Sequence, residues 1–89
     1  MPRRYLIELS RAAEKSLAAL PGEARKRIAS KIDSLAEDPR PDGATKLSGM
    51  ENIYRLRAGD YRILYEIRDR VLIVLVLTIG HRKDVYRRP

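Results

Sequence analysis

The stretch Asn52-Ile-Tyr-Arg-Leu-Arg-Ala-Gly-Asp-Tyr-Arg-Ile-Leu-Tyr-Glu-Ile67 decides the fold, because two runs of alternating side chains flank Gly59-Asp60. Alternation of this kind predicts β-strands, here over residues 53–57 and 61–68. A two-residue loop that begins with glycine suits a type II′ turn, so we expect a tight hairpin. The register of this hairpin pairs Ala58 with Tyr61, Leu56 with Ile63 and Tyr54 with Tyr65, which are expected to form one buried face.

The same register places three arginines on the opposite face of the hairpin. Arg57 is directly across from Arg62, and Arg55 is beside them. Like charges that face each other on a sheet destabilise it by a few tenths of a kcal/mol up to about 1 kcal/mol, so this arrangement does not help folding. Two interpretations follow: a site that binds an anion, or a solvated face on which the arginines spread apart. A three-residue loop would move Arg62 to the other face and remove the site.

A short strand and two helices are expected before the hairpin. Tyr5 to Leu9 alternates as a strand does, and Ser10 is placed to cap the helix that follows it. Apolar side chains at helical spacing predict one helix over residues 11–20 and a second over about 23–37, separated by Pro21-Gly22. So short a connection makes the two helices antiparallel neighbours. The apolar faces of these elements consist of Tyr5, Ile7, Leu9, Ala13, Leu17, Leu20, Ile28, Ile32 and Leu35.

The remainder of the chain completes a sheet. Residues 40–45 have the composition of a loop, residues 46–51 lead into the hairpin, and Asp69-Arg70 forms the next turn. Val71 to Ile79 is apolar on both faces, which indicates a central strand covered by the helices on at least one side. The fold class is therefore α+β: an N-terminal strand, a helical hairpin and a three-stranded antiparallel meander, with the helices on one face of the sheet. Residues 1–89 are expected to form a single domain.

The charge of the chain indicates a polyanionic partner. The chain has 89 residues, with 19 Lys and Arg, 12 Asp and Glu, a net charge of +7 and no cysteine. Residues 46–89 hold ten basic and five acidic side chains, and eight of the ten are arginine, which binds phosphate in bidentate fashion. Nucleic acid is the first candidate partner and an acidic protein the second, with a merely solubilising surface as the alternative. The longest apolar stretch is far below the ~20 residues of a membrane helix, so we expect a cytoplasmic protein.

Three side chains after the last predicted strand could supply proton transfer and further phosphate binding beside the arginines. His81, Arg82 and Tyr86 occur where a chain that leaves the sheet could place them beside the hairpin. Cleavage of RNA without a metal needs a group that takes the 2′-hydroxyl proton, cations that stabilise charge on phosphorus, and a group that protonates the leaving 5′-oxygen. Arginine serves the second task, and histidine or tyrosine can serve the others. The plainer interpretations are a surface histidine and a tyrosine that fills an edge of the core.

Nothing in the sequence indicates a metal or a cofactor. No cluster of carboxylates suggests a magnesium site, and no ligand spacing suggests zinc. No glycine-rich loop suggests a cradle for a nucleotide cofactor. The chemistry is therefore expected to depend on the side chains alone.

Three motifs resemble the RelE branch of the RelE/ParE toxin superfamily: Lys46-Leu-Ser-Gly49, Tyr54-Arg-Leu-Arg-Ala-Gly-Asp-Tyr-Arg-Ile-Leu-Tyr65 and Ile79-Gly-His-Arg-Lys-Asp-Val-Tyr86. The order of strand, helical hairpin and three-stranded sheet is also similar. The resemblance implies a toxin of a type II toxin–antitoxin system that cleaves mRNA and so inhibits translation, in many members within the ribosomal A site. It also implies an acidic antitoxin as partner, operator DNA bound only through the antitoxin complex, and no membrane partner.

The resemblance also implies roles for individual residues. Arg55 and Arg57 match a basic pair that is often lysine in the family, and Arg62 matches the arginine of the next strand. Arginine does not readily lose its proton, so these three are expected to hold and stabilise the phosphate. Arg82 and Tyr86 match the Arg and Tyr of the C-terminal segment, and either His81 or Tyr86 is expected to transfer protons. Stacking of Tyr86 on a base is the alternative. Two further cations, Lys46 and Lys83, are candidates for binding the RNA backbone.

Two other functions are compatible with the same scaffold. ParE-like relatives inhibit DNA gyrase and have no nuclease site. A chain that binds only its antitoxin and DNA would have lost catalysis. The segment His81-Arg82…Tyr86 favours the nuclease over both alternatives.

Overall fold

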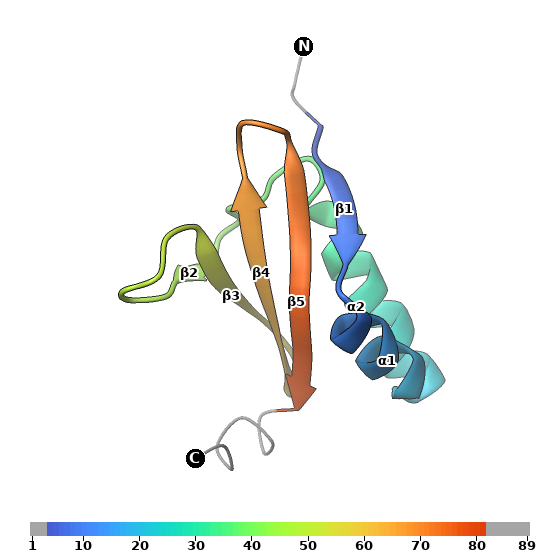
Figure 1. Cartoon of the computed structure of the whole chain (residues 1–89). Helices are drawn as coiled ribbons and strands as arrows, with labels where there is room; N and C mark the ends of the chain where they lie inside the picture. Colours follow the sequence, from blue (N-terminus) through green and yellow to red (C-terminus); the bar gives the residue numbers. More distant parts are fainter. Residues whose placement is uncertain (1–3, 82–89) are drawn as a thin grey trace.

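Two helices and five strands follow one another along residues 4–81, which are the part of the chain that the computed structural model describes (Figure 1); residues 1–3 and 82–89 lie outside it. The elements are β1 (Leu6–Leu9), α1 (Arg11–Ala19), α2 (Gly22–Ser34), β2 (Thr45–Lys46), β3 (Ile53–Ala58), β4 (Tyr61–Arg68) and β5 (Ile73–His81).

Several boundaries differ by one to three residues from those that the sequence predicts; β5, for example, ends at His81 and not at Ile79. α2 ends at Ser34, and residues 35–37 form a turn instead of a last helical segment. β5 begins at Ile73, because Val71 is 60% exposed and belongs with Leu72 to the turn after β4. The short strand β2 lies within a stretch that the sequence suggests is a loop and a lead-in, and it pairs with β3.

One five-stranded sheet, in the order β1-β5-β4-β3-β2, organises the molecule. β1 runs parallel to β5, and the other neighbouring strands are antiparallel. Both helices lie on the same side of this sheet (Figure 1), so the predicted α+β fold is confirmed. The predicted apolar helix faces are also confirmed, since Ala13, Ile28, Ile32 and Leu35 are at most 3% exposed. Neither helix within residues 4–81 has the length and apolar content that crossing a bilayer requires.

The hairpin of β3 and β4 has the register that the sequence predicts. Gly59 has a φ of 63°, and Asp60 is not among the residues with positive φ, which is the pattern of a type II′ turn. Leu56, Ile63 and Tyr65 are at most 3% exposed, so this face of the hairpin lies in the core. The inward-facing pairs are Ala58 with Tyr61, Leu56 with Ile63 and Tyr54 with Tyr65.

A β-bulge at Leu77 changes which side of the sheet the end of β5 faces. Leu77 has no partner on β4, because the register between the two strands shifts at this point. The buried positions of β5 are Val74 and Val76 before the bulge, but Ile79 after it. Side chains alternate along a strand, so one extra residue moves every later side chain to the opposite face. The bulge therefore decides the orientation of the last residues of β5.

Ser10 joins the start of α1 to this bulge. Its hydroxyl accepts a hydrogen bond from the Ala13 N–H at 3.0 Å, which confirms the predicted cap. The same hydroxyl donates to the Leu77 carbonyl oxygen at 2.6 Å. The backbone N–H of Ser10 donates to the Val76 carbonyl at 2.9 Å. One residue thus satisfies both an unpaired amide of the helix and the carbonyl of the bulged residue.

We expect Ser10→Ala to lower the free energy of unfolding by about 1–2 kcal/mol, because it removes the cap and leaves the Leu77 carbonyl without its partner. Urea denaturation followed by circular dichroism measures this loss. Ser34→Ala is the matched control, since its hydroxyl contacts only the Lys31 carbonyl of its own exposed helix end. Equal losses in the two variants would contradict the proposed role of Ser10.

Candidate functional site

The three arginines of the hairpin share the face of the sheet that the helices leave uncovered. Arg57 of β3 pairs directly with Arg62 of β4, and Arg55 pairs with Leu64. Both pairs alternate with the inward-facing pairs of the hairpin, so their side chains leave the sheet on the side away from the helices. This confirms that the three arginines share one face.

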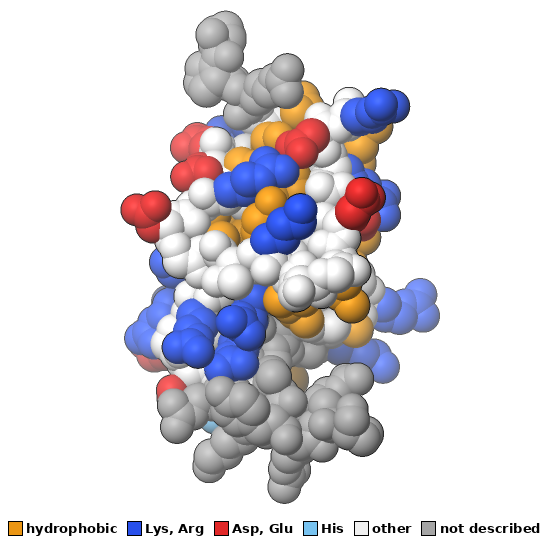
Figure 2. Space-filling model, turned by 90° about the vertical axis from the view of Figure 1, so that its left-hand side faces the viewer, with side chains coloured by type: hydrophobic (Ala, Val, Ile, Leu, Met, Phe, Trp, Pro, Cys, Tyr) orange, Lys and Arg blue, Asp and Glu red, His pale blue; other side chains and the backbone are white. Residues whose placement is uncertain are grey.

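The three arginines differ in exposure, and here the structure corrects the expectation of an open surface. Arg57 is exposed and Arg55 is half-buried, whereas Arg62 is only 7% exposed. Figure 2 looks at the molecule from the side of β2 and β3 and shows Lys and Arg side chains gathered in the lower half of the view. Burial holds Arg62 in a defined position, whereas the exposed Arg57 keeps its freedom to move.

Arg62 belongs to the wall of a pocket on this outer face, with a volume of about 210 Å³. Gly80 pairs with Arg62 and Thr78 pairs with Leu64, so the pocket spans the middle of the sheet across β3, β4 and β5. The described residues that line it are Leu47, Arg55, Arg62, Leu64, Thr78 and Gly80, and none of these is acidic. We name this feature the arginine pocket.

Few acidic side chains compensate the positive charge on the outer face. The ion pairs within residues 4–81 join Arg4 to Glu37, Arg40 to Asp69 and Arg68 to Glu66. Neither Arg55 nor Arg57 takes part in an ion pair among these residues. Cations that face one another across two neighbouring strands create a positive potential that attracts anions. The same part of the chain contains no group of three His, Cys, Asp or Glu side chains that could hold a metal ion.

His81 does not join the arginines, contrary to the prediction. It is the last residue of β5, and its ring lies edge-on to the Tyr61 ring with the centroids 5.2 Å apart. Both rings line a second pocket, of about 320 Å³, whose other walls include Ala19 and Leu20 at the end of α1. His81 therefore lies on the helix side of the sheet. The bulge at Leu77 is the physical reason, because without it His81 would face outward.

The other predicted site residues are placed as follows. Lys46 pairs with Tyr54, so the register puts it on the side of the sheet opposite to Arg55. It is exposed, but it is not part of the arginine pocket. Arg82, Lys83 and Tyr86 lie outside the described residues.

Comparison with known proteins identifies the family. Residues 7–86 match the family model described as the ParE toxin of type II toxin–antitoxin systems, parDE. The chain belongs to this toxin family. The mRNA interferase toxin RelE of Escherichia coli K12 is 31% identical over 86 residues, which cover 92% of this chain and 90% of that protein. This relative places the chain on the RelE branch, as its motifs suggest.

Solved structures agree with this assignment. The RelBE2 toxin–antitoxin complex of Mycobacterium tuberculosis contains a chain that matches with a TM-score of 0.79 and 25% identity, over 92% of this chain and 95% of that one. The archaeal RelE–RelB complex of Pyrococcus horikoshii matches with a TM-score of 0.77 and 28% identity, over 92% and 97% of the two chains. The chain is thus a toxin of a type II toxin–antitoxin system with the RelE fold.

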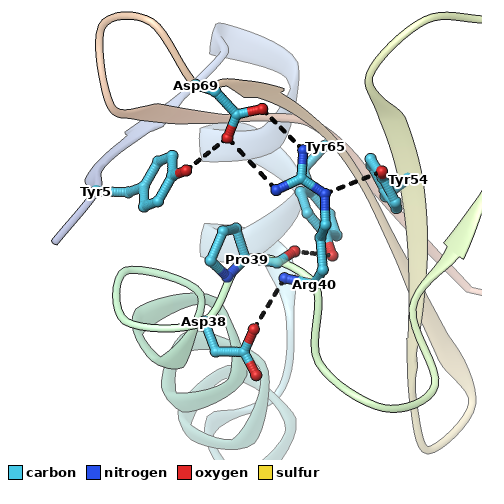
Figure 3. Close-up of polar contacts among 7 residues, drawn as sticks. All are labelled: Tyr5, Asp38, Pro39, Arg40, Tyr54, Tyr65 and Asp69. Atoms are coloured by element: carbon cyan, nitrogen blue, oxygen red, sulfur yellow. Dashed lines mark hydrogen bonds and ion pairs between the residues drawn. The ribbon is translucent and has the colours of Figure 1, made fainter. Parts of the chain in front are cut away.

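The toxin also contains a polar cluster that its sequence does not reveal (Figure 3). The cluster lies just past the C-terminal end of β4, at the opposite end of that strand from the Gly59-Asp60 turn. Arg40 donates to both carboxylate oxygens of Asp69, at 2.9 and 3.4 Å, and its Nε donates to the Tyr54 hydroxyl at 3.1 Å. The Tyr5 hydroxyl donates to Asp69 at 2.5 Å. The Tyr65 hydroxyl donates to the Pro39 carbonyl at 2.8 Å.

This cluster fixes the loop after α2 rather than binding a ligand. Its contacts join residues 14 to 64 positions apart, so they tie together the loop after α2, β3, β4, the turn after β4 and Tyr5 just before β1. Asp69 neutralises Arg40 and raises the pKa of its guanidinium, and the hydrogen bond to Asp69 raises the pKa of Tyr5. A cation already paired in this way offers little to an anion. No periodicity or turn signal in the sequence could have shown these contacts.

We expect the toxin to lose stability between pH 10 and pH 12 through Tyr65. Burial raises the pKa of the Tyr65 hydroxyl from 10.0 to about 12, so the unfolded chain releases this proton at lower pH than the folded protein does. The contribution of the Tyr65 hydroxyl to the free energy of unfolding is therefore complete below pH 10. It declines by about 2–3 kcal/mol as the pH rises toward 12.

Denaturant unfolding of the parent protein and Tyr65→Phe across this pH range measures the effect. At pH 7 the variant should be about 1 kcal/mol less stable, because it lacks the hydrogen bond to Pro39. That difference should shrink and reverse above pH 10. A difference that stays constant with pH would contradict the role of Tyr65.

Proposed function

We propose that this toxin is an mRNA interferase, an endoribonuclease that cuts mRNA by attack of the 2′-hydroxyl on the adjacent phosphate without a metal ion. The observation that carries the proposal is the pair Arg57–Arg62, set side by side on the uncovered face of the sheet and flanked by Arg55. The name of the E. coli relative, mRNA interferase toxin RelE, supports the same activity. We further propose that the mRNA is cut on the ribosome, as the family resemblance implies.

In this mechanism the arginines bind the phosphate and stabilise the additional negative charge on it. Arg57 is exposed and has room to approach a phosphate from solvent, whereas the buried Arg62 presents its guanidinium in a fixed position. A donor that is already oriented needs no reorganisation when charge develops, and its interaction is strengthened by the low dielectric of a partly buried site. Arg55 occupies the rim of the arginine pocket and supplies a further donor.

Proton transfer is assigned to the C-terminal segment. Arginine keeps its proton, so it does not act as the base. In the proposal Tyr86 takes the 2′-hydroxyl proton as the 2′-oxygen bonds to phosphorus, and the departing 5′-oxygen takes a proton from solvent. Arg82 contributes to catalysis as the resemblance implies, and Lys83 binds the RNA backbone. We leave His81 out of the proton transfer in this proposal, because its ring contacts Tyr61 and lines the pocket on the helix side of the sheet.

We propose that a cognate acidic antitoxin neutralises the toxin. Relatives from M. tuberculosis and P. horikoshii have been crystallised as complexes of toxin with antitoxin. The net charge of +7 on this chain favours an acidic partner. Operator DNA is bound only by the complex of the two proteins.

Arg57→Gln should reduce RNA cleavage by about 100-fold and relieve growth inhibition, because it removes a donor that stabilises charge on phosphorus. Arg57 is exposed, so the melting temperature should not change. Arg68→Gln is the matched control: it alters an exposed arginine of the same sheet face that is paired with Glu66 instead. Full toxicity of Arg57→Gln, or an equal loss in Arg68→Gln, would count against the site.

Arg62→Lys tests the buried member of the site. It keeps the charge but loses the planar fork that holds phosphate in two places, so we expect at least a tenfold loss of cleavage in a folded protein. Circular dichroism and thermal unfolding establish that the variant is folded. Wild-type cleavage by folded Arg62→Lys would show that only the charge matters at this position.

DNA gyrase inhibition is the second candidate function, because the family model that matches the chain is described as a ParE toxin. Mapping of transcript ends after brief induction of the toxin separates the two functions. Internal cuts in mRNA support the interferase, and double-strand DNA breaks with an SOS response support gyrase inhibition. Cuts that appear only in translated messages would support action on the ribosome.

A further inference from the structure

The arginine pocket has a composition that phosphate binding alone does not explain. Two of its lining residues are arginines, but Leu47 and Leu64 add aliphatic walls beside them. A phosphate gains nothing from apolar contact, since removing a charged group from water costs free energy. Arg57, the most exposed of the three arginines, is not part of the lining. The pocket therefore suits a different part of the RNA than the phosphate next to Arg57.

The size of the pocket limits what it can hold. Its volume of about 210 Å³ is below the roughly 300–1,000 Å³ of pockets that enclose a complete drug-sized ligand. One flat ring system fits this space, whereas a whole nucleotide does not. Single-stranded RNA offers such groups, because its unstacked bases can turn outward from the backbone into a protein surface.

Gly80 lines the pocket next to Arg62. Arg57, Arg62 and Gly80 form one row across three adjacent strands, through the pairs Arg57–Arg62 and Arg62–Gly80. Neighbouring strands are about 4.8 Å apart, so Gly80 lies roughly 10 Å from Arg57 along this row. Arg62 thus has a cation on one side and a position without a side chain on the other. A phosphate over Arg57 and Arg62 would leave the arginine pocket, which Gly80 also lines, for another group of the same RNA strand.

We infer that the arginine pocket seats one nucleobase of the RNA, next to the phosphate that Arg57 and Arg62 hold. Leu47 and Leu64 contact the faces of the base, and Gly80 leaves room for its ring. Among the described residues of the lining, Thr78 alone has an uncharged side chain that can both donate and accept a hydrogen bond, so it reads the edge of the base. This inference rests on the proposed function and adds a specificity-determining site to it.

Binding of short single-stranded RNA tests the base seat independently of cleavage. The RNA carries 2′-deoxyribose throughout the scissile region, so that it cannot be cut, and an abasic site is introduced at one position at a time. We expect one abasic position to raise Kd about tenfold, within the range for loss of one stacked base, and the others to change it little. Fluorescence anisotropy measures Kd.

Variants of the pocket connect this position to the structure. Gly80→Val and Leu64→Ala should each weaken binding of the unmodified RNA by about tenfold and abolish the effect of the abasic position. Thr78→Val should keep the affinity but change the preferred base at that position. Leu75→Ala is the matched control, because Leu75 is a half-buried leucine of β5 opposite Glu8 and Glu66, away from the pocket. Circular dichroism shows whether each variant is folded.

The outcomes distinguish the base seat from the nuclease activity. RNA that is cut normally, with Kd equally affected by an abasic site at every position, would overturn the base seat alone. The base seat would also be overturned if one abasic position raises Kd and this effect persists in folded Gly80→Val and Leu64→Ala. Position-dependent binding without cleavage of mRNA on translating ribosomes would leave the base seat in place and overturn the nuclease. Absence of both binding and cleavage would overturn both.

Discussion

The two-residue turn at Gly59-Asp60 is the constraint on which the rest of the structure depends. A glycine with positive φ followed by one further residue fixes the pairing of β3 with β4. Because side chains alternate along a strand, a slip by one residue would place the arginines in the core and the apolar residues in solvent. The same turn therefore determines both the packing of Leu56, Ile63 and Tyr65 and the facing position of Arg57 and Arg62.

The outer face of the sheet is arranged for ligand binding at some cost to stability. Two arginines that face each other repel, and burial of the Arg62 guanidinium removes part of its hydration. A sheet selected only for stability would place opposite charges or apolar side chains at these positions. Local arrangements that oppose folding are concentrated at functional sites, where the surrounding structure holds them in place. Here the surrounding structure is the set of buried side chains on the other face of β3 and β4, namely Leu56, Ile63 and Tyr65.

Much of this architecture follows from local signals in the sequence. The hairpin register, the two helices and the cap at Ser10 each depend on residues a few positions apart, and all three are as predicted. The bulge at Leu77 is different, because an uninterrupted apolar run shows no position at which one residue is skipped. That single residue decides on which side His81 lies, and the error in the predicted site follows from it. The contacts of Arg40 with Asp69 and Tyr54 are equally invisible, because they depend on how distant segments meet.

The position of β5 has a consequence for the synthesis of the toxin. Among the described strands, β5 is the last along the chain, yet it lies inside the sheet between β4 and β1, and Ser10 contacts a residue 67 positions later in the chain. The chain loses conformational entropy when it closes so long a loop, before the stabilising contacts between β1 and β5 have formed. Assembly of the sheet is therefore non-local. A nascent chain that has not yet released β5 from the ribosome lacks both the partner of β1 and the Gly80 edge beside Arg62. The arginine face therefore forms only after β5 has left the ribosome and paired with β4.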